Sequence, residues 1–261
     1  MDEKNEVYPV RAPYVVLACG GLGGLYKNST NFPHIAGDGL GIAMKHQVVL
    51  EHLDYIQIHP TTLYSHKPGR RFLISESVRG EGALLYDKNG QRFTNELQPR
   101  DLLSQAIFAQ MEKDGTDFVW EDMRPLGEET IMKHFPNIFH RCVEEGFDPR
   151  KEPIPVVPAQ HYFMGGIKVD LGSRTSMKGL YACGETSCNG VHGKNRLASN
   201  SLLESLVFAR KAADDMIFGQ TPEYVRADAI DMNMYESREE LLNACHETVL
   251  KEIERMKKSH E

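Results

Sequence analysis

The segment His192–Glu204 joins a short polar loop directly to an apolar helical pattern. The loop contains a histidine, an arginine and asparagines. Ser201 followed by Glu204 has the spacing of a capping box, which predicts a helix from Ser201 to about Phe218. The start of a helix exposes unpaired backbone N–H groups and therefore favours an anion or an electron-rich ring edge. From the spacing alone, an ordinary capped helix behind a solvated loop is an equally good interpretation.

An apolar run near the N-terminus ends in a cluster of glycines. Tyr14–Cys19 predicts a buried strand, and Gly20–Gly24 predicts a turn where the backbone approaches another group closely. The cluster lacks the G-x-G-x-x-G order of a dinucleotide fingerprint, so it is weak evidence by itself. Gly37–Gly39 then opens a helical pattern that continues to about Gln47.

Residues from about Leu53 to His161 form a mixed block of short strands, polar turns and one clear helix. The helix is predicted over Asp101–Lys113, with an apolar stripe on one face. The stripe comprises Leu102, Leu103, Ala106, Ile107 and Gln110–Met111. Prolines at 153, 155 and 158 favour an extended segment after this block. Strands are then expected at Ile167–Asp170 and Leu180–Cys183.

Composition narrows the class of protein. A formal net charge of -7 argues against nucleic acid and anionic membranes as partners. The chain has five cysteines and no C-x-x-C pair, so we expect buried, reduced thiols in a cytoplasmic protein, with no metal site. No apolar run approaches the ~20 residues that span a bilayer. The charged helix expected over Glu236–Ser259 has few apolar positions and is predicted to face solvent or a partner.

The segment His192–Glu204 closely resembles the flavin-binding signature of the L-aspartate oxidase family, within the succinate dehydrogenase/fumarate reductase flavoprotein superfamily. Further segments look like family motifs in family order. They are Gln57–Thr61, Ser75–Gly82, Pro99–Asp101, and Pro158–Tyr162 with Gly165–Gly166. Together the motifs cover the chain from about Val15 to Phe218.

The resemblance implies an α/β plus α+β fold with a discontinuous, partial FAD-binding domain. Residues 1–51 and 162–219 would form that domain, residues 52–161 an inserted capping domain that closes over the substrate, and residues 220–261 the start of a C-terminal helical region. Val15–Ala18 should then lie beside Tyr181–Cys183. The strand, G-x-G-x-x-G turn and helix with which full members begin do not occur, so we expect a fragment, a truncated reading frame or one piece of a split protein. Such a piece should bind FAD weakly by itself.

The resemblance also implies which residues contact FAD. They are Gly20, Gly21, Gly37, Asp38, Gly39, Glu185, Asn200, Ser201 and Leu202. Glu185 stands where the family uses a glutamate to accept hydrogen bonds from ribose or ribityl hydroxyls. Without the resemblance, Glu185 would be taken for a surface residue.

A dicarboxylate substrate requires cationic or hydrogen-bonding groups at both of its ends. By the resemblance, the substrate pocket is lined by His59, Ser75, Glu76, His161 and Arg196. Arg196 and His161 would bind one carboxylate, and His59 and the Ser75 hydroxyl the other. Each residue taken alone is more often a packing or surface residue.

Arg100 matches the family's arginine that donates or accepts a proton, a role that depends on burial and on neighbours such as Asp101 or Glu76. We expect Arg100 to converge with His59, His161 and Arg196 on one cleft. Convergence of cationic groups is costly without an anion, so it would indicate a site.

The implied function is oxidation of L-aspartate to iminoaspartate by hydride transfer from C2 to FAD, with oxygen or fumarate as electron acceptor, feeding quinolinate and NAD biosynthesis. The alternatives are a fumarate reductase or succinate dehydrogenase flavoprotein subunit, and an inactive fragment that needs a partner chain. Residues 196–204 favour the oxidase, because the respiratory enzymes typically place glycine-rich residues at Ala198–Ser199. Candidate partners are a dicarboxylate substrate (L-aspartate, fumarate or succinate), quinolinate synthase and a complementary N-terminal chain.

Overall fold

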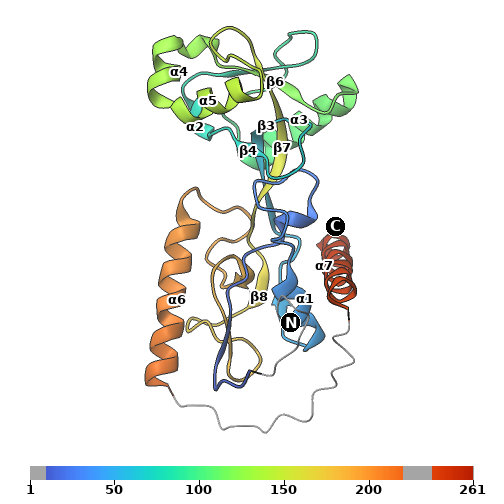
Figure 1. Ribbon diagram of the computed structural model, residues 1–261, viewed down its shortest axis with the longest axis vertical. Helices are drawn as coiled ribbons and strands as arrows, with labels where there is room; N and C mark the ends of the chain where they lie inside the picture. Colours follow the sequence, from blue (N-terminus) through green and yellow to red (C-terminus); the bar gives the residue numbers. More distant parts are fainter. Residues whose placement is uncertain (1–9, 220–236, 261) are drawn as a thin grey trace. The chain divides into compact units, whose positions relative to one another are not determined.

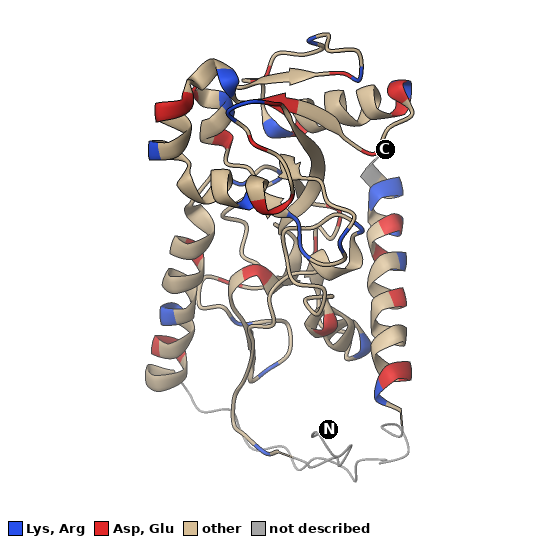
Figure 2. Ribbon diagram, turned by 45° about the horizontal axis from the view of Figure 1, so that its top comes forward, with Lys and Arg blue, Asp and Glu red and all other residues tan. Residues whose placement is uncertain are grey.

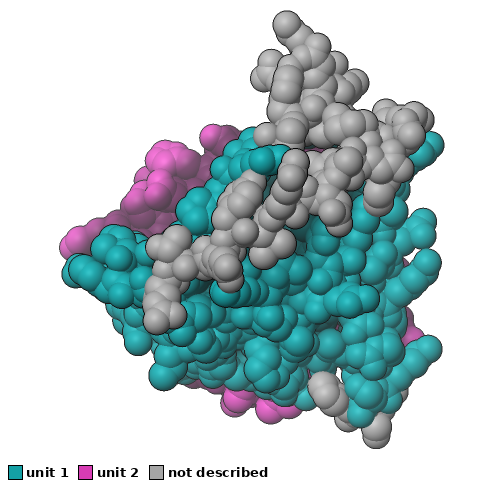
Figure 3. Space-filling model, turned by 90° about the horizontal axis from the view of Figure 1, so that it is seen from below, with its two compact units in different colours: residues 1–25, 34–57, 162–261 teal, residues 26–33, 58–161 magenta. Residues whose placement is uncertain are grey.

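The computed structural model describes residues 10–219 and 237–260. These residues divide into two compact units, which Figure 3 colours separately. Unit 1 comprises residues up to 25, residues 34–57 and residues from 162 onward, and unit 2 comprises residues 26–33 and 58–161. Each unit is described by itself below.

Unit 2 is built on a five-stranded sheet with the strand order β4-β3-β7-β6-β5. Figure 1 labels β3, β4, β6 and β7 of this sheet. Its strands are β3 (Ile56–Leu63), β4 (Phe72–Leu73), β5 (Leu84–Tyr86), β6 (Val119–Asp122) and β7 (Ile154–Phe163). β7 is buried at nearly every position, which is typical of a strand covered on both faces. The prolines at 155 and 158 lie within it, so the extended segment predicted from them is confirmed.

The helices of unit 2 are short apart from one. They are α2 (Glu76–Gly80), α3 (Arg100–Asp114), the 3-10 turn η2 (Arg124–Leu126), α4 (Glu128–His134) and α5 (Pro136–Glu144). Pro99 stands at the N-cap of α3 and Gly115, in the left-handed region at φ 66°, ends it, which are the residue types that favour these positions. The predicted helix is confirmed to within one residue at each end. Its stripe is narrower than expected, because Leu102 is 48% exposed whereas Leu103 and Ile107 are buried.

One hydrophobic core fills unit 2. It contains Leu63, Ile74, Val78, Ala83, Leu85, Leu103, Ile107, Val119, Met123, Ile131, Phe135, Ile138, Phe139, Cys142, Ile154 and Val156. Side chains alternate between the two faces of a strand, so Glu121 on β6 shares a face with the core residues Val119 and Met123. A carboxylic acid is therefore buried in the apolar core of this unit.

In unit 1, β1 (Val15–Leu17) pairs in parallel with β9 (Leu180–Ala182). This confirms that the two predicted strands lie side by side despite their separation in sequence. The prediction that the first strand is buried is wrong, because Val15 and Val16 are 50% and 41% exposed. Among the described residues, β9 is the one strand that pairs with β1, so the other edge of β1 has no neighbouring strand.

A second sheet of unit 1 has the order β10-β8-β2. Its strands are β2 (Leu50–Glu51), β8 (Gly166–Lys168) and β10 (Ser187–Cys188). Gly166 has φ 137° and lies so close to the backbone of Thr186 that a Cβ would stand 2.5 Å from its carbonyl oxygen. Glycine is therefore required where β8 meets the turn before β10.

Two helices of unit 1 pack together, α1 (Asp38–Lys45) and α7 (Arg238–His260) (Figure 1). Val249 and Ile253 of α7 are fully buried, so the helix predicted to face solvent or a partner also buries one side within unit 1. Acidic and basic residues occur along the length of α7 (Figure 2), and several form ion pairs with each other. Because these charged residues outnumber the buried apolar ones, composition alone did not reveal the buried positions. Within residues 10–219 and 237–260, no helix combines the length and apolarity needed to cross a bilayer.

The remaining helix of unit 1, α6, runs over Asn200–Phe218. Its end is confirmed, but the predicted capping box is wrong. The N-cap is Ser199, in the left-handed region at φ 65°, and no side chain caps the helix. Glu204 does not reach back to the helix start because its carboxylate accepts a hydrogen bond from Asn189 Nδ2. Asn189, in the loop before the helix, is therefore the partner of Glu204 in place of a backbone N–H at the helix start.

The units differ from the expected domain boundaries in three segments. Residues 26–33 were assigned to the FAD-binding part but belong to unit 2. Backbone hydrogen bonds explain the difference, because Thr30 N donates to Gln160 O and Arg71 N donates to Ser29 O. The first boundary lies at residues 57–58 instead of 51–52, and α7 groups with unit 1.

All five cysteines are reduced, but the expectation that they are buried is only partly right. Cys142, Cys183 and Cys188 are buried, Cys19 is exposed and Cys245 is half-buried. Cys245 lies against Gly41, where a Cβ would stand 2.7 Å from the Cys245 Cβ. This glycine lets α7 approach α1.

Candidate active site

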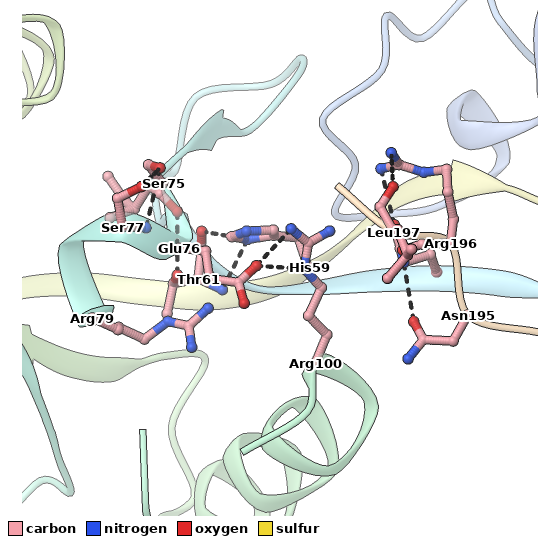
Figure 4. Close-up of polar contacts among 12 residues, drawn as sticks. His59, Thr61, Ser75, Glu76, Ser77, Arg79, Arg100, Asn195, Arg196 and Leu197 are labelled. Carbon is pink, nitrogen blue, oxygen red and sulfur yellow. Dashed lines mark hydrogen bonds and ion pairs between the residues drawn. The ribbon is translucent and has the colours of Figure 1, made fainter. Parts of the chain in front are cut away.

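The centre of the candidate site in unit 2 is an ion pair between the first residues of two helices. Arg100 opens α3 and Glu76 opens α2. Arg100 Nε and Nη2 donate to the same oxygen, Glu76 Oε2, at 2.8 and 2.6 Å (Figure 4). The Arg100 side chain is 14% exposed and that of Glu76 53% exposed. Of the two neighbours predicted for Arg100, Glu76 is the one that binds its guanidinium, and Asp101 is an exposed residue of α3.

His59, on β3, is almost completely buried in unit 2. Its Nδ1 contacts the backbone of Thr61 at two atoms, 3.0 Å from the carbonyl oxygen and 3.3 Å from the amide nitrogen (Figure 4). Burial, followed by the charges of His161, Arg100 and Arg79, holds the pKa of His59 well below its ordinary value of 6.5. The ring is therefore neutral at neutral pH.

His161, on β7, lies beside His59. The ring centroids are 5.5 Å apart and the rings meet edge to face at 69°. His161 Nδ1 lies 2.8 Å from the hydroxyl oxygen of Thr30. The structure thus brings His59, His161 and Arg100 together in unit 2. The His161 ring contacts His59, and the positive charge of Arg100 helps to lower the pKa of His59.

Two further residues of α2 and its cap complete this cluster. The Ser75 hydroxyl accepts from Ser77 N and donates to Ser77 Oγ, each at 3.3 Å, so it caps α2. Its predicted contact with a substrate carboxylate stays a prediction. Arg79 is buried and donates from Nη1 to Glu96 O at 2.7 Å. Burial lowers the pKa of Arg79, and the negative charges of Glu121 and Glu76 partly oppose that shift.

Arg196 belongs to unit 1 and is held there on several sides. Its Nη2 donates to Gln57 Oε1 at 3.0 Å, and Gln57 Nε2 donates back to Arg196 O at 2.8 Å. The guanidinium lies over the ring of Tyr162, 4.4 Å from its centroid, in cation–π geometry. Arg196 is only 6% exposed. Its convergence with the unit 2 cluster stays a prediction.

Glu185 carries the buried carboxylate of unit 1 in the turn η3 (Gly184–Thr186). Its Oε1 accepts from Phe163 N at 2.9 Å, and burial raises its pKa to about 7. Gly21 lies directly against it, because a Cβ there would stand 2.5 Å from Glu185 Oε1. The glycine cluster Gly20–Gly24 therefore approaches this carboxylate at Gly21, in agreement with the predicted close approach of the backbone to another group.

Gly37, Asp38 and Gly39, which are predicted to contact FAD, lie at the start of α1. Gly37 is the N-cap at φ 81°, and Asp38 Oδ1 lies 2.9 Å from His246 Nε2 of α7. A Cβ at Gly39 would come within 3.3 Å of Cys19 and Thr186. Gly20, at φ 77°, turns the chain after β1. These positions bring several backbone segments of unit 1 together, and their contact with a cofactor stays a prediction.

The start of α6 supplies donors for an acceptor. Asn200 N donates to Leu197 O, whereas the N–H groups of Ser201 and Leu202, in the first turn of the helix, have no acceptor within it. No side chain caps them, and Leu202 is 76% exposed. An isoalloxazine ring needs hydrogen-bond donors for its oxygens, and the uncapped helix start can supply them. The ribityl chain needs an acceptor for its hydroxyls, and the buried carboxylate of Glu185 can supply that. Unit 1 therefore offers groups suited to the flavin end of FAD.

Comparison with known proteins identifies the family. The model of the family described as FAD binding domain matches residues 2–202. The chain belongs to this family. It is 56% identical over 205 residues to L-aspartate oxidase of Clostridium perfringens, covering 78% of the chain and 47% of that protein. It is 51% identical over 215 residues to L-aspartate oxidase of Clostridium acetobutylicum, covering 82% and 50%.

A solved E. coli quinol fumarate reductase resembles the chain with a TM-score of 0.71 and 36% identity, covering 92% of this chain and 43% of that one. The resemblance to the succinate dehydrogenase/fumarate reductase flavoprotein superfamily, the mixed α/β fold with a FAD-binding domain, and FAD as the family's cofactor are therefore confirmed. The chain spans about half the length of the curated relatives it matches.

Sequence reasoning missed three residues that fix the predicted ones in place. Thr30 contacts His161, Gln57 binds Arg196, and Tyr162 lies beneath the Arg196 guanidinium. Gln57 and Tyr162 stand inside recognised motifs, next to the residues chosen as ligands. Thr30 lies outside them, and only the fold places it at β7.

Proposed function

We propose that the protein containing this chain oxidises L-aspartate to iminoaspartate with FAD as hydride acceptor. The observation that carries the proposal is the Arg100–Glu76 pair beside His59 and His161 in unit 2. The high identity to L-aspartate oxidases supports this substrate. FAD, when bound, supplies the acceptor for the hydride from C2, and the remaining chemistry falls to the protein's side chains.

In this proposal His59 and His161 bind and orient the substrate carboxylates, and Arg100 exchanges a proton with the reacting substrate. The Glu76 carboxylate fixes the Arg100 guanidinium through two hydrogen bonds, which limits its rotation. Arg196 and the Ser75 hydroxyl are proposed as further carboxylate ligands on the strength of the family motifs. Glu185, with Asn200, Ser201 and Leu202, would hold the flavin end of FAD.

The second candidate is a fumarate reductase or succinate dehydrogenase flavoprotein, which the fold similarity to quinol fumarate reductase supports. The two candidates differ in the electron donor. Anaerobic addition of L-aspartate to the FAD-loaded protein should bleach the flavin absorbance and yield oxaloacetate and ammonia after hydrolysis of the imine. Bleaching by succinate and not by L-aspartate would favour the respiratory enzyme. Bleaching by neither would favour an inactive piece that needs a partner chain.

We also propose that iminoaspartate passes to quinolinate synthesis and so to NAD. This step follows from the chemistry of the product, because iminoaspartate hydrolyses readily and has to be consumed by a condensing enzyme. Oxygen or fumarate would reoxidise the flavin. Quinolinate synthase as a direct partner, and a cytoplasmic location, stay predictions.

A further inference from the structure

A short segment of unit 2, Asn28–Asn31, lies against strand β7 and is tied to one residue of it. Gln160 N donates to Asn28 O at 2.9 Å, and Thr30 N donates to Gln160 O at 2.9 Å. The Gln160 side-chain oxygen accepts from Ser29 Oγ at 2.8 Å and from Asn31 Nδ2 at 2.9 Å. We name this segment the strap. These bonds hold the strap in register with the residue that precedes His161.

The Thr30 hydroxyl of the strap has two partners. Its Oγ1 lies 2.8 Å from His161 Nδ1 and 3.4 Å from Gln160 O. A hydroxyl carries a single hydrogen, and a carbonyl oxygen can only accept. Both contacts are satisfied together when Thr30 donates to Gln160 O and accepts from Nδ1–H of His161. Thr30 is 8% exposed, so water has little access to replace either partner.

We propose that Thr30 is a positioning residue for His161, holding the ring through its Nδ1–H so that the ring meets the substrate through Nε2. The inference rests on the proposed function, in which His161 binds a substrate carboxylate. Threonine suits this task because its branched Cβ restricts χ1 and so fixes the direction of the hydroxyl. The strap in turn fixes the backbone of Thr30.

The arrangement has a chemical consequence for the ring. A neutral histidine with its proton on Nδ1 presents a lone pair at Nε2, which repels a carboxylate. His161 therefore has to bind a carboxylate as the imidazolium, with an N–H at each nitrogen. The neighbouring His59 ring is neutral, so it opposes that positive charge less than a protonated ring would.

Two substitutions at Thr30 test the proposal on the whole chain. Thr30→Val removes the hydroxyl and keeps the shape, whereas Thr30→Ser keeps the hydroxyl. The ¹⁵N shifts of the His161 ring, assigned by the signals lost in His161→Gln, report which nitrogen carries the proton. We expect a protonated Nδ1 in the wild type and in Thr30→Ser, and a shift of the proton toward Nε2 in Thr30→Val. A wild-type ring whose Nδ1 is unprotonated, or a Thr30→Val ring identical to the wild type, overturns the proposal.

Fumarate binding, measured by calorimetry, is the second readout. Thr30→Val should weaken the affinity about tenfold, as expected for loss of one orienting hydrogen bond, and Thr30→Ser should stay within about twofold. Thr116→Val is the matched control, because its hydroxyl donates to Phe118 O elsewhere in unit 2 and its loss should change neither readout. Unaltered fumarate affinity in Thr30→Val contradicts the positioning role. A wild type that binds no fumarate contradicts the proposed function, while the ¹⁵N shifts still decide whether Thr30 fixes the ring.

Discussion

Arg100 and Glu76 meet at a single carboxylate oxygen, to which Arg100 donates from both Nε and Nη2. Arg100 is the first residue of α3, where a positive side chain opposes the positive end of the helix dipole. The carboxylate of Glu76 offsets that cost. An arginine at a helix N-terminus is electrostatically unfavourable, and here it is kept by pairing with a residue of a second helix. Such departures from local preference are expected more often at functional sites than at purely structural positions.

Replacing Arg100 with lysine should abolish most of the proposed activity. Lysine keeps the charge but loses the planar fork that binds Glu76 and aims the proton, so we expect kcat to fall by about 10²–10⁴. Flavin bleaching by L-aspartate in single-turnover, anaerobic measurements gives the rate. Arg150→Lys is the control, since Arg150 makes a two-point pair with Asp148 away from the cluster. Equal loss of rate in both variants would assign Arg100 a structural role only.

Glu121→Gln should remove a pH dependence of stability. Burial raises the pKa of Glu121 from its ordinary 4.5 to about 7, so between these values the folded protein keeps a proton that the unfolded chain releases. The free energy of unfolding of the wild type should therefore fall as pH rises from about 4.5 to 7, by up to about 3 kcal/mol. Glutamine cannot ionise, so Glu121→Gln should be the more stable protein at pH 8 and close to the wild type at pH 4.5.

Urea denaturation across this pH range measures the effect of Glu121→Gln. Glu144→Gln, at an exposed position of α5, is the matched control and should follow the wild type throughout. The expectation fails if Glu121→Gln and the wild type keep the same difference in unfolding free energy at every pH.

Gly21→Ala should destabilise unit 1 by displacing a buried carboxylate. The new Cβ would stand 2.5 Å from Glu185 Oε1, so Glu185 has to move and release Phe163 N. A buried N–H without a partner costs about 1–3 kcal/mol. Gly80→Ala is the comparison, because a Cβ there meets nothing within 4 Å and alanine favours the helix. Thermal and urea unfolding should show a lower stability for Gly21→Ala than for Gly80→Ala. Equal stabilities would show that the Glu185 side chain moves aside without cost.

A pair of serine substitutions should distinguish a real helix cap from an apparent one. Ser75 accepts from Ser77 N at the start of α2, so Ser75→Ala should cost about 1 kcal/mol of unfolding free energy. Ser201 lies inside α6 and its side chain caps nothing, so Ser201→Ala should change that free energy by less than about 0.5 kcal/mol. A larger cost for Ser201→Ala would restore the capping box.

The sequence by itself determined the elements whose signals are local. The strand before the first glycine cluster, the helix bounded by Pro99 and Gly115, and the end of α6 at Phe218 all follow from neighbouring residues. Turn chemistry and hydrophobic period act over a few residues, so they can be read without the fold. The family motifs likewise identified His59, Arg100 and His161, three residues that the fold gathers in unit 2.

Only the tertiary structure decided which groups these elements bind. It paired Glu204 with Asn189 in place of the helix start, chose Glu76 as the partner of Arg100, and brought Thr30 to His161 across 131 positions. It also buried Val249 of a charged helix against α1. A side chain can bind any partner that folding brings within hydrogen-bond distance. Which partner that is depends on chain segments far apart in sequence. Local spacing carries no record of those segments, and for this reason the capping box was mispredicted and the buried side of α7 was not predicted.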